Sequence, residues 1–135
     1  MSTPGEPDAR VVEGIIPILR VRNLKASIAW YVGVLGFRED WHVPGVMASV
    51  SHDRRPLMLR EGAQGATGTW VWIGVNDARR WHEHARTHGA TISLPLKNFP
   101  WALEFHVQDP DGHVLRVGSE PAADQPQDAW PEGIE

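Results

Sequence analysis

Residues 16–37 read IPILRVRNLKASIAWYVGVLGF, and their pattern recurs later in the chain. The run from Ile15 to Val21 is apolar and rich in β-branched residues, which predicts a strand. Asn23 can cap the start of a helix, and Gly36 can adopt the left-handed conformation that often ends one. The apolar residues between them have helical spacing: Leu24, Ile28, Tyr31, Val32 and Leu35. This stretch therefore predicts a strand followed by an amphipathic helix.

The rest of the first half is expected to contain short strands. Val46–Ser51 and Pro56–Glu61 lie on either side of the turn HDRR at residues 52–55. A glycine-rich linker, Gly62–Gly68, follows them. We interpret the first half as one β-α-β-β-β unit.

The second half repeats this order. Asp77 can cap a second helix, which Gly89 can end. The expected strands are Trp70–Val75, Thr91–Leu94, Ala102–Val107 and His113–Val117. The last two flank Asp109-Pro-Asp-Gly, a sequence typical of a reverse turn. Because neither half is large enough to bury a sheet face alone, the halves should pack together or exchange between chains.

Composition and charge indicate one small globular domain. The 135 residues are 41% hydrophobic and 22% charged, with a net charge of −4. From Ser119 onward the chain contains acidic residues but no lysine or arginine, so the preceding part is nearly neutral. We expect a flexible N-terminus at residues 1–13, βαβββ modules at 14–62 and 69–119, and a mobile or loosely docked acidic tail at 120–135.

The same composition argues against several protein classes. The sequence has no basic cluster of the kind that binds nucleic acid. It also has no run of eighteen apolar residues that could span a membrane. The first ten residues lack the apolar stretch of a secretory signal. The absence of cysteine excludes disulfides and thiolate chemistry and favours a cytoplasmic location.

Seven tryptophans are the unusual feature of so short a chain. Trp70 and Trp72 alternate along an expected strand and therefore share one face. Trp41 and Trp101 lie in segments where packing does not force burial. Indole rings stack on flat ligands, and their faces attract cations. For Trp30 and Trp81, on the helices, core or interface packing is the better interpretation, and Trp130 could cover a site or hang free.

The chain resembles the vicinal oxygen chelate superfamily, which includes glyoxalase I and the extradiol dioxygenases, and within it the bleomycin resistance proteins. The segments that carry this resemblance are Pro17-Ile18-Leu19 with Phe37, Trp70-Val71-Trp72-Ile73, and Pro100-Trp101-Ala102-Leu103-Glu104-Phe105 leading into the turn at residues 109–112. The resemblance covers residues 15–119. It implies an α+β fold in which two βαβββ modules form a cup-shaped mixed sheet. It also implies a homodimer with ligand crevices at the subunit interface and possible exchange of the first strand.

The resemblance also indicates where a metal centre would lie in this chain. The positions that hold metal ligands in the superfamily's enzymes correspond here to Ile16, Met58, Trp70 and Arg116. Isoleucine and tryptophan cannot coordinate a divalent cation, a thioether is unsuited to such a site, and a guanidinium repels the ion. We therefore expect no metal and no other cofactor.

The expected site is a crevice that binds its ligand without catalysis. Its residues are Trp41, Met47, Ser49, Met58, Arg60, Trp70, Trp72, Trp101, Glu104 and Arg116. Glu104 and His106 share a strand face and could form a carboxylate–imidazole pair, for which a structural hydrogen bond is the simpler interpretation. Glu39, Asp40 and Glu61 are further carboxylates that could meet a cationic ligand.

The remaining histidines are expected to be ordinary surface residues. His42, His52 and His113 fall in expected loops or turns. His84 and His88 have a spacing that can hold a metal, but with His82 they belong to a helix whose buried face is set by Trp81 and Ala85. A solvated helix face is therefore the better interpretation.

The resemblance favours a cytoplasmic, metal-free homodimer that sequesters an antibiotic of the bleomycin class, a bulky aromatic and cationic glycopeptide. Two departures from the pattern of the resistance proteins affect the choice of ligand. Ala102 and Leu103 replace a glycine and an arginine that are common there, and Arg116 adds a positive charge inside the cup. The alternative is a glyoxalase-like enzyme, a lyase, an isomerase or a natural-product tailoring catalyst, that uses the same cup. A weaker possibility is a sensor of another small aromatic molecule.

Overall fold

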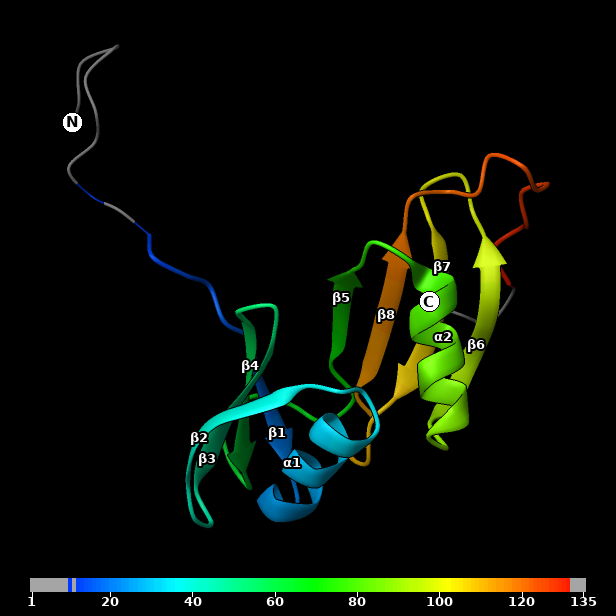
Figure 1. The fold of residues 1–135 in the computed structure, drawn as a ribbon. Coiled ribbons are helices and arrows are strands. Elements are labelled where there is room, and N and C mark those ends of the chain that lie inside the picture. The colour runs from blue at the N-terminus through cyan, green and yellow to red at the C-terminus, as the bar shows by residue number, and fades with distance from the viewer. Residues whose placement is uncertain (1–9, 11, 132–135) are drawn as a thin grey trace.

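The computed structural model describes residue 10 and residues 12–131, and Figure 1 shows two helix-and-sheet units in sequence. The elements are β1(Ile18–Val21), α1(Leu24–Gly33), β2(Arg38–Val43), β3(Met47–His52), β4(Arg55–Glu61), β5(Trp70–Gly74), α2(Ala78–Thr87), β6(Thr91–Asn98), β7(Leu103–Gln108) and β8(Val114–Ser119). This order is β-α-β-β-β twice, which confirms the α+β fold class. The remaining parts of the expected N-terminus and acidic tail, residues 1–9, 11 and 132–135, lie outside the described residues.

Each unit forms its own four-stranded mixed sheet. The strand orders are β1-β4-β3-β2 and β5-β8-β7-β6. In both sheets the first strand pairs in parallel with the last, and the other pairs are antiparallel. The two sheets are separate within the chain, and β1 and β5 lie at their edges (Figure 1).

Both helices begin where the sequence predicts, and α1 ends at Gly33, shortly before the expected Gly36. The Asn23 side chain accepts a hydrogen bond from the Ala26 N–H at 2.9 Å, and Asp77 caps α2 in the same way through the Arg80 N–H. Gly36 follows α1 with a φ of +77°, a conformation that costs glycine little. Both helices have ten residues, and no helix in the described part of the chain is long and apolar enough to cross a membrane.

Two strands differ from the sequence-based expectation. The sequence does not predict β2, because its residues lack the usual apolar alternation, and all six of them are exposed in the structure. β6 continues to Asn98, past the expected end at Leu94. Pro95 is tolerated there because β6 is an edge strand and its pairing with β7 is irregular around this residue.

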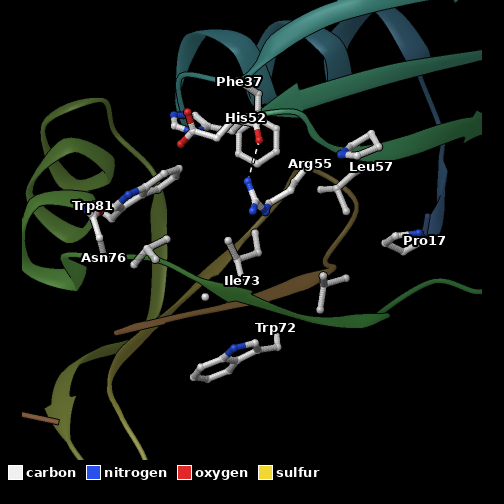
Figure 2. A pocket seen from close by; sticks show the side chains of 14 residues that line it. Pro17, Phe37, His52, Arg55, Leu57, Trp72, Ile73, Asn76 and Trp81 are labelled. Carbon is white, nitrogen blue, oxygen red and sulfur yellow. Dashed lines mark hydrogen bonds and ion pairs between the residues drawn. The ribbon is translucent and has the colours of Figure 1, made fainter. Parts of the chain in front are cut away.

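One hydrophobic core joins the two units. Each sheet turns one face toward its helix, and most buried residues of these faces belong to a single cluster. Its fully buried strand residues are Leu19, Val21, Ala48, Val50, Leu59, Phe105, Val107, Leu115 and Val117. A cavity of about 650 Å³ remains between the units, with Phe37 and His52 on one side and Ile73 and Trp81 on the other (Figure 2). The expectation that the halves pack together is therefore confirmed.

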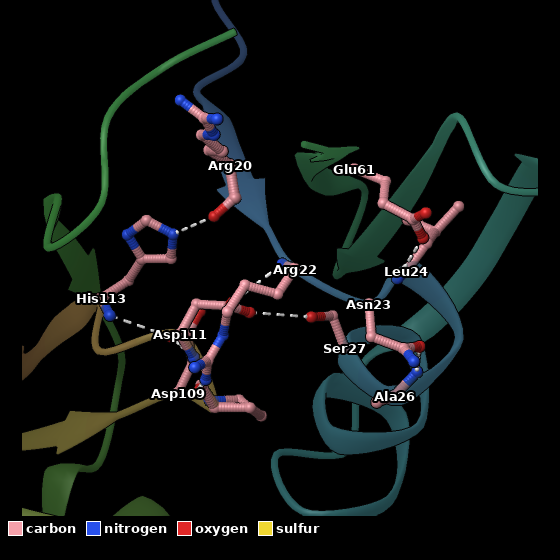
Figure 3. Close-up of polar contacts among 11 residues, drawn as sticks. Arg20, Arg22, Asn23, Leu24, Ala26, Ser27, Glu61, Asp109, Asp111 and His113 are labelled. Atoms are coloured by element: carbon pink, nitrogen blue, oxygen red, sulfur yellow. Dashed lines mark hydrogen bonds and ion pairs between the residues drawn. The ribbon is translucent and has the colours of Figure 1, made fainter. Parts of the chain in front are cut away.

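The turn between β7 and β8 binds the first unit through polar contacts (Figure 3). The Tyr31 hydroxyl donates to Asp109 Oδ2 at 2.8 Å, and the Arg22 backbone N–H donates to Asp111 Oδ1 at 2.8 Å. His113 Nε2–H donates to the Arg20 carbonyl at 2.6 Å, while its Nδ1 accepts from the Thr69 N–H at 3.0 Å.

The surface position predicted for His113 was wrong. This side chain is fully buried, and its two hydrogen bonds fix one neutral tautomer of the ring. His52 also differs from a simple surface residue, because it ends β3 and packs edge-on against Trp81. The sequence predicts a turn before His113, but it does not show that this turn packs against the first unit and buries the histidine.

Tyr31→Phe is expected to lower the free energy of unfolding by about 1–2 kcal/mol, because it leaves Asp109 Oδ2 buried without this donor. Burial and the neighbouring Asp109 raise the pKa of Tyr31 well above its ordinary value, so the hydroxyl stays protonated and donating. Urea unfolding at neutral pH measures the effect. An unchanged midpoint and slope would show that this contact does not hold the units together.

Candidate functional site

Each sheet also has a face directed away from its helix, which we call its open face. In β4, Leu57 and Leu59 are buried toward the helix, so Met58 and Arg60 belong to the first open face. In β7, Phe105 belongs to the core, so Glu104 and His106 belong to the second open face.

The ten residues predicted to bind the ligand divide between these faces. The first open face carries Trp41, Met47, Ser49, Met58 and Arg60. The second carries Trp70, Trp72, Glu104 and Arg116, and Trp101 reaches it from the loop before β7. The structure thus brings the second group together and places the first group on a different sheet of the same chain.

Glu104 organises the second open face. Its side chain is 0% exposed and accepts two hydrogen bonds from Arg116, from Nε at 2.9 Å and from Nη2 at 3.0 Å. Trp101 Nε1 also donates to it, and its Oε2 lies 2.8 Å from His106 Nε2. The carboxylate–imidazole pair foreseen in the sequence is therefore one part of a larger network.

The network keeps Glu104 ionised. Burial alone would raise the pKa of the Glu104 carboxyl, but the hydrogen bonds from Arg116, Trp101 and His106 together hold it below its usual value. Burial lowers the pKa of His106, and its contact with Glu104 only partly opposes this effect. Glu104 is a positioning residue here, because its acceptor sites are directed at three side chains of the protein itself.

Acidification is expected to destabilise the protein, beginning below about pH 6.5 and continuing below about pH 4.3, the ordinary pKa values of histidine and glutamate. His106 and Glu104 both have lowered pKa values in the fold, so the unfolded chain binds protons more readily than the folded one. Stability must then fall as pH falls. Urea unfolding from pH 8 to pH 4 measures this loss, and His106→Gln should reduce the part between pH 7 and pH 5. If His106→Gln lost stability with pH in the same way as the unaltered protein, the loss between pH 7 and pH 5 would not be due to His106.

Indole rings surround the Glu104–Arg116 pair. The Arg116 guanidinium carbon lies 5.4 Å from the Trp72 ring centroid and 5.1 Å from that of Trp130. Trp101 stacks on Phe99, with ring centroids 4.9 Å apart and planes inclined by 11°. Trp70, Trp72 and Trp101 remain 46%, 49% and 51% exposed. Three indoles thus offer surface to a ligand while the polar network fixes their surroundings.

Gly118 is required for the position of Trp72. The indole lies directly over this buried glycine, and a Cβ at residue 118 would overlap Trp72 Cη2. Any side chain here must therefore move the ring. Sequence reasoning did not identify Gly118, since an isolated glycine in a strand signals only that another group approaches closely.

The C-terminal segment is hydrogen-bonded beside the same face. It is held more firmly than the mobile or loosely docked tail that the sequence suggests. The buried Asn98 side chain accepts from the Ala122 N–H and donates to the carbonyls of residues 122, 125 and 126. The Asn98 backbone exchanges two further hydrogen bonds with Asp128. This anchor brings the Trp130 ring against Phe99 and Trp101. No pattern in the sequence predicts that the C-terminal segment forms hydrogen bonds with Asn98.

The first open face combines a mostly apolar row of side chains with a carboxylate that already has partners in the protein. Met58 pairs across the sheet with Ile18 and Ser49, and Ser49 pairs with Trp41. Asp40 accepts hydrogen bonds from Ser49 and Ser51, and Arg38 lies 3.5 Å away. The hydrogen bond from Ser51 is the main reason that the pKa of Asp40 lies below its ordinary value.

Glu39 and Glu61, proposed from the sequence as carboxylates for a cationic ligand, point elsewhere. Glu61 accepts a hydrogen bond from the Leu24 N–H at the start of α1. Glu39 contacts His42 on the helix side of β2. Both carboxylates line a cavity of about 750 Å³ between α1 and β2, away from the open face. Glu61 points to the helix side because it alternates with Arg60 along β4. Glu39 pairs with the core residue Val50, next to a residue shift in the pairing of β2 with β3 that is invisible in the sequence.

The two cavities described above do not coincide with the predicted site. Of the ten predicted residues, only Trp72 contributes to the 650 Å³ cavity between the units. In Figure 2 its ring lies on the side of β5 opposite Ile73, which points into that cavity. The other nine predicted residues line neither of these two cavities.

The side chains do not fit the metal centre of the superfamily's enzymes. Arg116 is held by Glu104, and the other corresponding positions, Ile16, Met58 and Trp70, provide no oxygen or nitrogen ligand. Among residues 10 and 12–131, no group of three or more histidine, aspartate or glutamate side chains could hold a metal ion. The His84 ring stacks on His88, and His82 packs against Phe105.

Comparisons with known proteins agree with this architecture. The chain shares 23% identity with the crystal structure of TioX from Micromonospora sp. ML1, covering 81% of this chain and 99% of that one with a TM-score of 0.73. A bleomycin-binding protein from bleomycin-producing Streptomyces verticillus, complexed with copper(II)-bleomycin, shares 24% identity over 82% and 98% of the chains, with a TM-score of 0.71. The antibiotic-binding protein TnmS3 from Streptomyces sp. CB03234 shares 19% identity over 84% and 100%, with a TM-score of 0.68.

At these identities the solved structures establish the fold alone. A sequence comparison with curated proteins found no significant match. The family model described as Glyoxalase/Bleomycin resistance protein/Dioxygenase superfamily matches residues 11–117, most of the chain. With the paired βαβββ units, this match confirms the resemblance deduced from the sequence, and the chain belongs to the glyoxalase/bleomycin resistance protein/dioxygenase superfamily.

Proposed function

We propose that this protein binds and sequesters a flat aromatic small molecule, an antibiotic of the bleomycin class or a similar compound, without a metal ion. The main support is that Trp70, Trp72 and Trp101 leave about half of their surface exposed on one face, while the core is filled by other residues. Exposed indoles gathered around a fixed polar network are typical of a recognition surface. The antibiotic-binding proteins of the same fold are consistent with this proposal.

The polar groups of the second open face support binding over catalysis. A general acid or base needs an atom within reach of the substrate and a pKa near the working pH. Glu104 is enclosed by three donors and its pKa is lowered further, while His106 is buried against it. Their arrangement orients side chains and leaves the ligand chemically unchanged.

The proposal includes a homodimer. Each open face is one wall, and a second copy would place the first open face of one chain opposite the second open face of the other. All ten predicted residues would then line two equivalent crevices, as expected for a twofold assembly. Light scattering should give twice the 15.1 kDa mass of one chain. We propose a cytoplasmic location, since sequestration lowers the free drug concentration where the drug acts.

A thermal-shift screen of aromatic antibiotics tests the proposal, because a ligand that binds the folded state alone raises its stability. Bleomycin and phleomycin are included. A hit is then titrated against tryptophan fluorescence, and the ligand is recovered and analysed by mass spectrometry. The proposal expects saturable quenching with one ligand per chain and an unchanged ligand. Recovery of a converted product would favour a lyase, an isomerase or a tailoring enzyme instead.

A further inference from the structure

The charges of the two open faces indicate which kind of aromatic ligand they fit. Among the described strand residues, these faces carry five basic and two acidic side chains. They are Arg20, Arg38, Arg60, Lys97 and Arg116 against Asp40 and Glu104. The nearly neutral body of the chain thus concentrates positive charge on the surfaces where a ligand is expected.

Both acidic side chains already have partners. Asp40 is held by Ser49, Ser51 and Arg38. Glu104 accepts from Arg116, Trp101 and His106 and is fully buried. To bind a cationic group, either carboxylate would first have to give up these contacts, and for the fully buried Glu104 this costs more than a new ion pair returns.

Arg20 and Arg60 form an adjacent pair of positive charges. They are opposite one another on the parallel strands β1 and β4 and share the first open face. Arg60 donates to the carbonyls of Val46 and Glu61, which leaves its charge unbalanced. In the described part of the chain, neither guanidinium has a carboxylate within ion-pair distance. Like charges side by side on a sheet are unfavourable unless an anion lies between them.

We propose that the ligand is a flat aromatic molecule that carries an anionic group, such as a carboxylate or sulfonate. The rings stack on the indoles of the second open face, and the anionic group binds between Arg20 and Arg60 of the facing chain. This inference rests on the proposed function and narrows its ligand class. The cationic glycopeptide expected from the family resemblance is the competing ligand.

Two probes with the same ring system test the charge preference. Anilinonaphthalene sulfonate carries one negative charge, and N-phenylnaphthylamine lacks it. We expect the sulfonate to bind about tenfold more tightly, as one good charged contact permits. Added salt should reduce this preference, since a partly exposed ion pair is screened. The double variant Arg20→Gln/Arg60→Gln should bring the two affinities within about threefold of each other.

The matched control is Arg79→Gln/Arg80→Gln, which removes the same net charge from the exposed surface of α2. It should keep the preference, and circular dichroism should show that both double variants remain folded. Equal binding of both probes, tighter binding of bleomycin, or the same loss in the control would overturn the charge assignment while the binding function stands. Failure of every aromatic probe to bind would instead contradict the proposed function.

Discussion

Glu104→Ala is expected to lower the free energy of unfolding by about 3 kcal/mol, the cost of breaking a buried ion pair by removing one partner. The substitution leaves the Arg116 guanidinium without its two acceptors. It also removes the acceptor of Trp101 and the partner of His106. Because Trp101 then loses its anchor, ligand affinity should fall together with stability. Urea unfolding and fluorescence titration measure the two effects.

Two further variants separate charge from shape. Glu104→Gln retains one acceptor oxygen for Trp101, so its loss of stability should be smaller than that of the alanine variant. Glu83→Gln is the matched control, because Glu83 also pairs with an arginine, Arg86, but on an exposed helix face. It should change stability little. Equal effects of Glu104→Ala and Glu83→Gln would show that the buried network has no special role.

Trp72→Ala is expected to weaken ligand binding by about 2 kcal/mol, roughly 30-fold, because it removes a stacking surface at the centre of the proposed site. Trp72 also covers one side of Arg116. Gly118→Ala should reduce affinity as well, since a methyl group there pushes the retained ring out of place. Titration calorimetry on both variants, with folding checked by circular dichroism, measures the effect.

Trp81→Ala is the informative control for this prediction. Trp81 lines the cavity between the units, on the opposite side of β5 from the Trp72 ring (Figure 2). The variant should lose some stability, because Trp81 packs against the core, but its affinity for the ligand should stay within about threefold of the original. If Trp81→Ala abolished binding and Trp72→Ala did not, the ligand would belong in the inter-unit cavity.

The fold follows from local signals in the sequence. The caps Asn23 and Asp77, the glycines that end the helices and the Asp109–Gly112 turn mark each element, and the repeated order implies two similar units. The alternation of Trp70 and Trp72 correctly predicts that they share a face. These signals act over a few residues, so they can be identified without knowing how the units pack.

The connections of the site depend on contacts that no local pattern encodes. Asn98 is one polar residue in an irregular strand, and only the folded chain shows that it holds a segment thirty residues away and so positions Trp130. His113 follows a turn that would face water in an isolated unit. Glu104 could be assigned to a polar pair, but its enclosure by Arg116 and Trp101 also requires the registers of β7 and β8 and the path of the preceding loop.

A crystal structure of the protein with the ligand that gives the largest thermal shift tests the binding site directly. We expect an aromatic ring against Trp72 and Trp101 of one chain, enclosed by the first open face, which carries Met58, of a second chain. A ligand seated instead between Phe37 and Trp81, or a cation coordinated at the base of the crevice, would contradict it.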